Sequence, residues 1–247
     1  MYGKGLRALS LVTLVALTAT FALAVFYAPL DADQGFIQKI FYLHVPIAII
    51  TLATYVVGGL MALQYLRSGD RKWDLRSYVV IHISLIFNVI GLISGSIWAR
   101  ASWGHWWVWD EPTLVSFLIV FLLYATYQPL RFSIEDPERQ ARYASVFAII
   151  AGAFVPLNFI AVRMATSVVH PRTFATTNGG LPASMAWVFV VAIISLGLLF
   201  WTMAKYEITQ KNATWQLRAL RRRLLGEEAV APRGRSAAPT IAQGGPS

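Results

Sequence analysis

Cysteine is absent from this 247-residue sequence, and charged side chains are scarce. The lack of cysteine excludes disulfides, thiolate metal sites, cysteine nucleophiles and thioether attachment of a cofactor to this chain. Charged residues make up 13% of the sequence, whereas a soluble domain carries about 25%. The missing charge leaves long apolar runs, so the composition indicates a membrane protein.

The sequence also lacks the phosphate-binding pattern G-x-x-x-x-G-K-[ST], so any use of ATP would have to come from a partner. The net charge of +9 at first suggests a nucleic-acid partner. The basic residues, however, lie in the short connections between apolar runs and in the tail, as membrane orientation requires. We therefore expect membrane lipid, and no nucleic acid, around this chain.

Six apolar runs are long enough to cross a bilayer, and each should be a helix because lipid offers no hydrogen-bond partner to backbone amides. We expect an all-α membrane protein with a six-helix transmembrane bundle. The expected spans are roughly Leu9–Tyr27, His44–Leu63, Tyr78–Trp98, Thr113–Pro129, Tyr143–Met164 and Ala183–Lys205.

Basic residues are concentrated on one side of these spans, which predicts that both termini lie in the cytoplasm. The outer segments hold only a few basic residues, which are Lys39, Arg100, Arg163 and Arg172. The three outer connections are Asp31–Tyr42, Ala101–Pro112 and Ala165–Pro182.

The chain divides into a membrane domain, residues 1–206, and a cytoplasmic tail, residues 207–247. The tail begins as a basic amphipathic helix, with Leu217, Leu220 and Leu224 on one side. After Gly226 it is rich in alanine, proline and glycine, a composition typical of disordered segments.

Five of the nine tryptophans fall between residues 98 and 109. At helical spacing Trp103, Trp106, Trp107 and Asp110 would share one face and form a flat aromatic platform at the outer interface. Indole faces favour offset stacking on other flat rings, so a porphyrin would suit such a platform. The alternative is an ordinary interfacial belt, because tryptophan is enriched at both membrane surfaces.

The run Trp103-Gly104-His105-Trp106-Trp107-Val108-Trp109-Asp110 resembles the tryptophan-rich signature of haem-handling proteins in cytochrome c biogenesis. With Phe41-Tyr42-Leu43-His44-Val45-Pro46, the length and the six spans, the chain resembles the cytochrome c maturation protein C (haem exporter protein C) family. It departs from that family at Asp110-Glu111-Pro112-Thr113-Leu114, where the family often has an arginine two residues after the aspartate, followed by Leu-Thr. The role of the missing arginine is left unassigned.

Histidines in different outer connections flank the tryptophan segment. Haem iron takes neutral imidazole nitrogens on opposite faces of the ring, and the resemblance implies that His44 and His170 are this pair, holding haem b non-covalently. A single interfacial histidine can equally be a polar end-cap, so the pair is favoured jointly. His105 could replace either ligand or bond a propionate. His82 suits a hydrogen-bonded bundle histidine, or a position on an entry route for haem.

The haem propionates would need cationic partners, and Arg100, Arg163 and Arg172 can pair with carboxylates, although lipid headgroups could equally occupy them. Asp110 could orient the platform, bond an imidazole, or simply end a helix. The predicted site therefore has two iron ligands, His44 and His170. Its other predicted members are Trp103, Trp106, Trp107, Trp109, Asp110, Arg100 and Arg172.

These features predict a haem-binding protein rather than an enzyme, one that presents haem to a periplasmic haem chaperone. The resemblance implies that the chaperone is cytochrome c maturation protein E. It further implies a small one-span subunit (protein D), the ABC transporter subunits (proteins A and B) and a place in a bacterial-type cytoplasmic (inner) membrane. Two alternatives stay open. One is a haem transporter subunit working with the ABC transporter, although midplane polar groups are sparse and no repeat is seen. The other is a haem–cytochrome c synthetase, but those proteins are usually longer.

Overall fold

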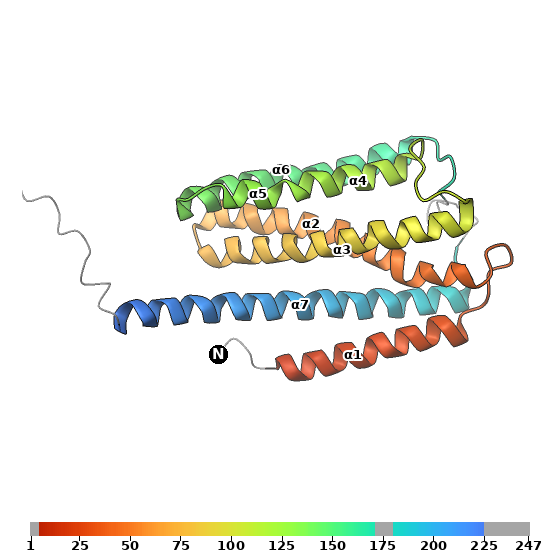
Figure 1. The fold of residues 1–247 in the computed structure, drawn as a ribbon, viewed down its shortest axis with the longest axis horizontal. Coiled ribbons are helices and arrows are strands. Elements are labelled where there is room, and N and C mark those ends of the chain that lie inside the picture. Colours follow the sequence, from red (N-terminus) through yellow and green to blue (C-terminus); the bar gives the residue numbers. More distant parts are fainter. Residues whose placement is uncertain (1–4, 171–179, 225–247) are drawn as a thin grey trace, which may run out of the picture. The chain divides into compact units, whose positions relative to one another are not determined.

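The computed structural model describes residues 5–170 and 180–224, and helices account for most of them (Figure 1). The expected six-span, all-helical bundle is confirmed. The elements long and apolar enough to cross a membrane are Leu6–Tyr27, Phe36–Ser68, Arg71–Trp103, Pro112–Phe132, Pro137–Met164 and Ala183–Leu224. In order they comprise α1 (Leu6–Ala22) with a π-helical turn (Leu23–Tyr27), a 3₁₀ helix (Phe36–Ile40) with α2 (Phe41–Ser68), α3 (Arg71–Trp103), α4 (Pro112–Ala125) with α5 (Tyr127–Phe132), α6 (Pro137–Met164) and α7 (Ala183–Leu224).

The helices extend beyond the apolar runs because polar residues close their ends. Gly69 ends α2 in the left-handed conformation, with a φ of 68°, which glycine adopts without strain. The next residue, Asp70, caps α3 by accepting a hydrogen bond from the Lys72 backbone N–H at 2.9 Å. Hydropathy alone marks only the apolar middle of such a helix, so the expected spans were too short.

Small residues let α2 and α6 approach closely in the core. A Cβ atom on Gly59 would lie 2.9 Å from the carbonyl oxygen of Ala148, so only glycine fits there. Nearby, the buried rings of Tyr55 and Tyr124 stack with their centroids 3.6 Å apart. Close backbone approach at small residues is the usual way in which membrane helices pack.

A buried ion pair fixes α5 against α3. The guanidinium of Arg131 donates to both carboxylate oxygens of Asp74, at 2.7 and 2.8 Å. It also lies 4.9 Å from the centre of the Tyr78 ring. This bidentate arrangement satisfies two charges that would be costly to bury singly.

Hydroxyl groups join α1 to α7, which lie side by side in Figure 1. Thr13 and Thr202 share a buried hydrogen bond at 2.8 Å, and Thr20 donates to Ser195 at 2.7 Å. Much of the remaining surface of α1 is exposed and apolar. In lipid, such polar contacts specify which helices pair.

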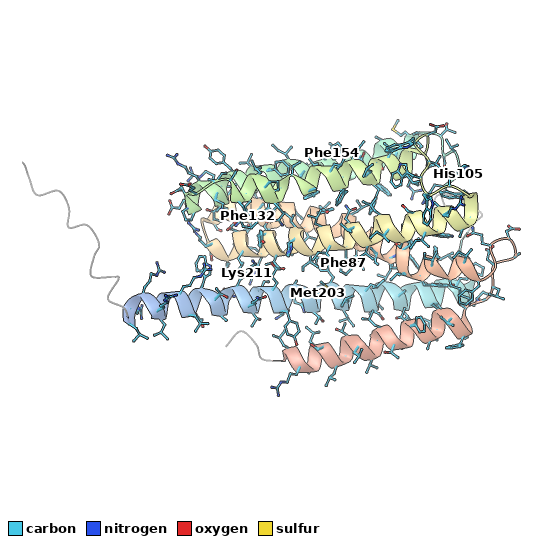
Figure 2. The ribbon with its side chains drawn as sticks, viewed as in Figure 1. Phe87, His105, Phe132, Phe154, Met203 and Lys211 are labelled. Carbon is cyan, nitrogen blue, oxygen red and sulfur yellow. The ribbon has the colours of Figure 1, made fainter. Side chains whose placement is uncertain are left out.

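The last helix runs without interruption past the predicted domain boundary at residue 206 and ends at Leu224. The described residues divide into two compact units, one holding residues 5–170 and 180–208 and the other holding residues 209–224. The basic segment that includes Lys211, labelled in Figure 2, is therefore a continuation of the sixth span. The predicted disordered end, after Gly226, lies outside the described residues.

Candidate functional site

A cavity of about 250 Å³ lies between α2, α3, α4 and α6. Its lining includes residues at the end of the bundle where α3 and α6 end and where α2 and α4 begin, and Figure 1 shows these helix ends together. We call this end the tryptophan end, because the segment from Trp103 to Trp109 lies there. Most of the side chains that line the cavity are apolar, so it suits a largely apolar ligand.

Two histidines line this cavity, and they are His44 and His170. His44 belongs to the first turn of α2. His170 lies in the connection that follows α6. The other two histidines, which the structure also describes, do not line the cavity. The fold therefore brings together two imidazoles that are far apart in the sequence.

One ring nitrogen of His44 faces a serine hydroxyl on α3. His44 Nδ1 lies 3.0 Å from Ser94 Oγ, and Ser94 uses its own proton to bond the carbonyl oxygen of Gly91 at 3.2 Å. When the serine proton goes to Gly91, the serine oxygen accepts a hydrogen bond from a protonated Nδ1. This arrangement leaves the lone pair of Nε2 available to a metal.

Glycine at position 95 allows the His44 ring to lie directly against α3. A Cβ atom there would be 2.7 Å from His44 Cε1, a separation shorter than van der Waals contact. Neither Ser94 nor Gly95 stood out in the sequence, because small residues are common in membrane helices.

Each imidazole also contacts the edge or face of an indole. The ring centroids of His44 and Trp98 are 5.9 Å apart, and those of His170 and Trp103 are 6.2 Å apart. Both contacts are T-shaped, a favourable arrangement for aromatic rings. Trp98 in turn donates a hydrogen bond to Gln34 at 2.7 Å. Sequence reasoning did not include Trp98 or Gln34 in the site.

The predicted helical platform was wrong, because α3 ends at Trp103 and residues 104–111 form an irregular loop. Gly104 has a φ of 77° and closes the helix, with the Arg100 guanidinium bonded to its carbonyl oxygen. At the other end of the loop, Pro112 holds Glu111 in an extended conformation. Both of these breaking signals are visible in the sequence.

The tryptophans of this segment consequently point in different directions. Trp103 and Trp107 line the cavity. Trp106 and Trp109 do not, and they are 60% and 71% exposed. The Nε1 of Trp107 is buried and has no hydrogen-bond partner among the described residues. An unsatisfied donor at such a place is available to a ligand acceptor.

The charged residues predicted for the site also separate. Asp110 is exposed and does not line the cavity, and the same holds for His105, labelled in Figure 2. Arg100 serves as the helix cap just described and is likewise outside the lining. Arg163 does line the cavity, with its guanidinium 5.0 Å from the Phe159 ring centre. Arg172 lies outside the described residues.

His82 lies on α3 and shares a hydrogen bond with Glu207 of α7, at 2.9 Å between Nδ1 and Oε2. Its ring stacks on Tyr78, with centroids 5.9 Å apart. These contacts agree with the interpretation of His82 as a hydrogen-bonded bundle histidine.

Glu111 is completely buried beside the site. Its Oε1 accepts a hydrogen bond from the Thr113 backbone N–H at 3.2 Å and so caps α4. Its Oε2 accepts from the next connection, namely from the backbone N–H groups of Val168, Val169 and His170 at 2.9, 2.9 and 3.1 Å, and Ser167 Oγ lies 3.2 Å from the same oxygen. Burial alone would raise the pKa of Glu111, but the backbone hydrogen bonds outweigh it and lower the pKa to about 2. The residue is therefore an anion at neutral pH.

The sequence of this chain is similar to those of known proteins. A family model described as heme exporter protein C matches residues 1–223. A protein of Rhodobacter capsulatus named Heme exporter protein C is 29% identical over 200 residues, which are 80% of this chain and 82% of that protein. One of the same name from Paracoccus denitrificans is 32% identical over 145 residues, 59% of this chain and 60% of its own length. A mitochondrial protein of Marchantia polymorpha, named for cytochrome c biosynthesis, is 29% identical over 163 residues, 66% of this chain and 68% of that protein.

Proposed function

This chain belongs to the haem exporter protein C family, and on that premise we propose that it binds haem at the tryptophan end and delivers it for cytochrome c assembly. The observation that supports this most is the placing of His44 and His170 on one cavity. Two neutral imidazoles on one apolar cavity are the donor set that a bis-histidine haem requires. The haem is cargo, held as haem b through its iron and its faces, since the chain has no cysteine for a thioether bond.

The remaining lining of the cavity suits a porphyrin. Trp103 and Trp107 offer aromatic surface, and Arg163 supplies a cation for a propionate. The cavity volume of about 250 Å³ falls below the roughly 300–1,000 Å³ of ordinary ligand pockets. Part of the macrocycle would therefore project from the tryptophan end, where Trp106 and Trp109 are exposed. A projecting edge is what a protein that hands its ligand on needs to present.

We propose further that the tryptophan end faces the periplasm and that the protein lies in a bacterial-type inner membrane. The positive-inside rule supports this orientation, since the opposite end carries Arg67, Arg71, Arg139 and Arg142. The proposed recipient is the periplasmic chaperone, cytochrome c maturation protein E. Protein D and the ABC transporter proteins A and B are the proposed companions, as the resemblance implies. The predicted members and neighbours of this site also include Asp110, His105, Arg100 and Arg172.

A haem titration of the purified chain in detergent tests the ligand assignment. The protein should give the visible spectrum of a low-spin, bis-histidine haem. His44→Ala and His170→Ala should each abolish that spectrum, because each removes one axial nitrogen. His82→Ala is the control, since this histidine bonds Glu207 and does not line the cavity. If both ligand variants kept the wild-type spectrum, the proposal would be wrong.

The orientation can be tested on the same chain, because it has no cysteine of its own. We expect Ala101→Cys, at an exposed position of the tryptophan end, to react with a membrane-impermeant maleimide in whole cells. Glu135→Cys, exposed between α5 and α6, should react only after the membrane is opened. The reverse labelling pattern would place the site in the cytoplasm and refute delivery to a periplasmic chaperone.

A further inference from the structure

We propose that Glu111 is the positioning residue of His170, holding the connection that carries this histidine so that the imidazole stands at the cavity. The inference rests on the proposed function, because it assigns Glu111 a role toward the same haem. It goes beyond that function because Glu111 itself is not one of the residues that line the cavity. It acts through the backbone of residues 167–170.

The geometry of these contacts is unusually specific. Three consecutive backbone N–H groups, from Val168, Val169 and His170, converge on the single oxygen Oε2 of Glu111. Successive N–H groups that point to one centre form an anion-binding concavity. Residues 166–170 belong to no helix, so these N–H groups need partners from elsewhere. The carboxylate supplies the partner that secondary structure would otherwise give.

The side chains of Val168 and Val169 are 58% and 37% exposed, so they do not anchor this connection in the core. Ser167 closes a local turn, with its Oγ 2.7 Å from the His170 carbonyl oxygen. Trp103 orients the His170 ring by an edge contact. Glu111 therefore holds the His170 backbone by a direct hydrogen bond, while Trp103 contacts the ring of the same residue.

The helix cap and the connection use different oxygens of Glu111. Capping of α4 needs only Oε1, which accepts from Thr113. Oε2 accepts from the backbone N–H groups of residues 168–170. The carboxylate is fully buried, and a buried anion is stable only while its donors stay in place. Any separation of the connection from Glu111 is therefore disfavoured.

The test compares haem binding by the full-length wild type, Glu111→Gln and Glu111→Asp. Glu111→Gln weakens the charge-assisted hydrogen bonds at nearly constant size. Glu111→Asp keeps the charge and can still cap α4, but it is one methylene too short to reach residues 168–170. We expect haem affinity to fall about 10- to 100-fold in both variants, the usual effect of removing the partner that orients a metal ligand.

The spectrum gives a second readout that a loss of stability alone would not move. Both variants should shift from a low-spin towards a five-coordinate haem spectrum. Added imidazole should restore the low-spin form by taking the place of His170. In a His170→Ala background, Glu111→Gln should cause no further change, since its effect passes through that histidine.

The chain contains a matched control in Asp136, which caps α6 and precedes Pro137 just as Glu111 caps α4 and precedes Pro112. Asp136 accepts from the backbone N–H groups of Glu138 and Arg139, at 3.1 and 2.7 Å. Asp136→Asn should therefore leave haem affinity and spectrum unchanged.

The possible failures are distinguishable. A wild-type chain without a bis-histidine spectrum would refute the proposed function itself. A wild-type chain with that spectrum, together with unchanged affinity and spectrum in folded Glu111→Asp, would refute the positioning role alone. An additional loss when Glu111→Gln is combined with His170→Ala would also refute it, since Glu111 would then act by another route.

Discussion

Replacing Gly95 by alanine should change helix stability and haem binding in opposite directions. The new Cβ atom would lie 2.7 Å from His44 Cε1, whereas ordinary contact begins at 3.4 Å, so the ring has to retreat by roughly 0.7 Å. That movement also stretches the 3.0 Å hydrogen bond to Ser94. Meanwhile alanine favours the helical backbone of α3 by about 1 kcal/mol over glycine.

We therefore expect Gly95→Ala to unfold at the same temperature as the wild type or higher, yet to bind haem about 10- to 100-fold more weakly. Thermal unfolding of the haem-free protein and haem titration by absorbance measure the two effects on one preparation. Gly197→Ala, in α7, is the control, since a Cβ there meets no atom within 4 Å. It should share the gain in stability and keep full haem affinity.

The reasoning fails if Gly95→Ala binds haem with wild-type affinity and a wild-type spectrum. The position of the His44 ring against α3 would then have no bearing on ligation. A variant that loses stability as well as haem would also contradict it, because a flexible imidazole, and not the helix, is expected to give way.

Three smaller perturbations test other parts of the structure. Ser94→Ala removes the hydrogen-bond partner of His44, a loss of about 0.5–1.5 kcal/mol. Haem affinity should fall severalfold in a titration while the low-spin spectrum remains. A five-coordinate spectrum would contradict this prediction. Arg131→Met leaves Asp74 buried without its partner. The haem-free protein should lose about 3–5 kcal/mol of stability in thermal or denaturant unfolding. An unfolding midpoint equal to that of the wild type would contradict this prediction. Thr13→Val breaks one hydroxyl contact between α1 and α7 and should cost only about 0.6 kcal/mol in the same assay, so complete unfolding would be unexpected.

The span pattern was predictable because hydropathy alone determines it, but the site was predictable only in part. Gly104 and Pro112 both signal the end of a helix, and giving them more weight than the helical spacing of the tryptophans would have predicted the loop. By contrast, no spacing in the sequence relates His170 to His44, and that pairing came from family resemblance.

The roles of the residues that hold His44 and His170 in place depend on helix packing, which a single sequence does not specify. Ser94 and Gly95 look like ordinary small residues of a membrane helix until α2 is placed against α3. For Glu111, the position before a proline and an apolar run indicates a helix cap. The second oxygen of the same carboxylate acquires its partners only when α6 returns to the tryptophan end.

The hydroxyl contacts between α1 and α7 have a consequence for biosynthesis. The first span to be made finds these partners only in the last one, so α1 waits in the bilayer while the other spans are inserted. During that interval the hydroxyls of Thr13 and Thr20 can each donate to a carbonyl oxygen one turn earlier, which lies 2.8 and 2.9 Å away in the structure. The newly made segment can therefore wait among lipids without exposing an unbonded proton, and it joins the protein only when translation nears its end.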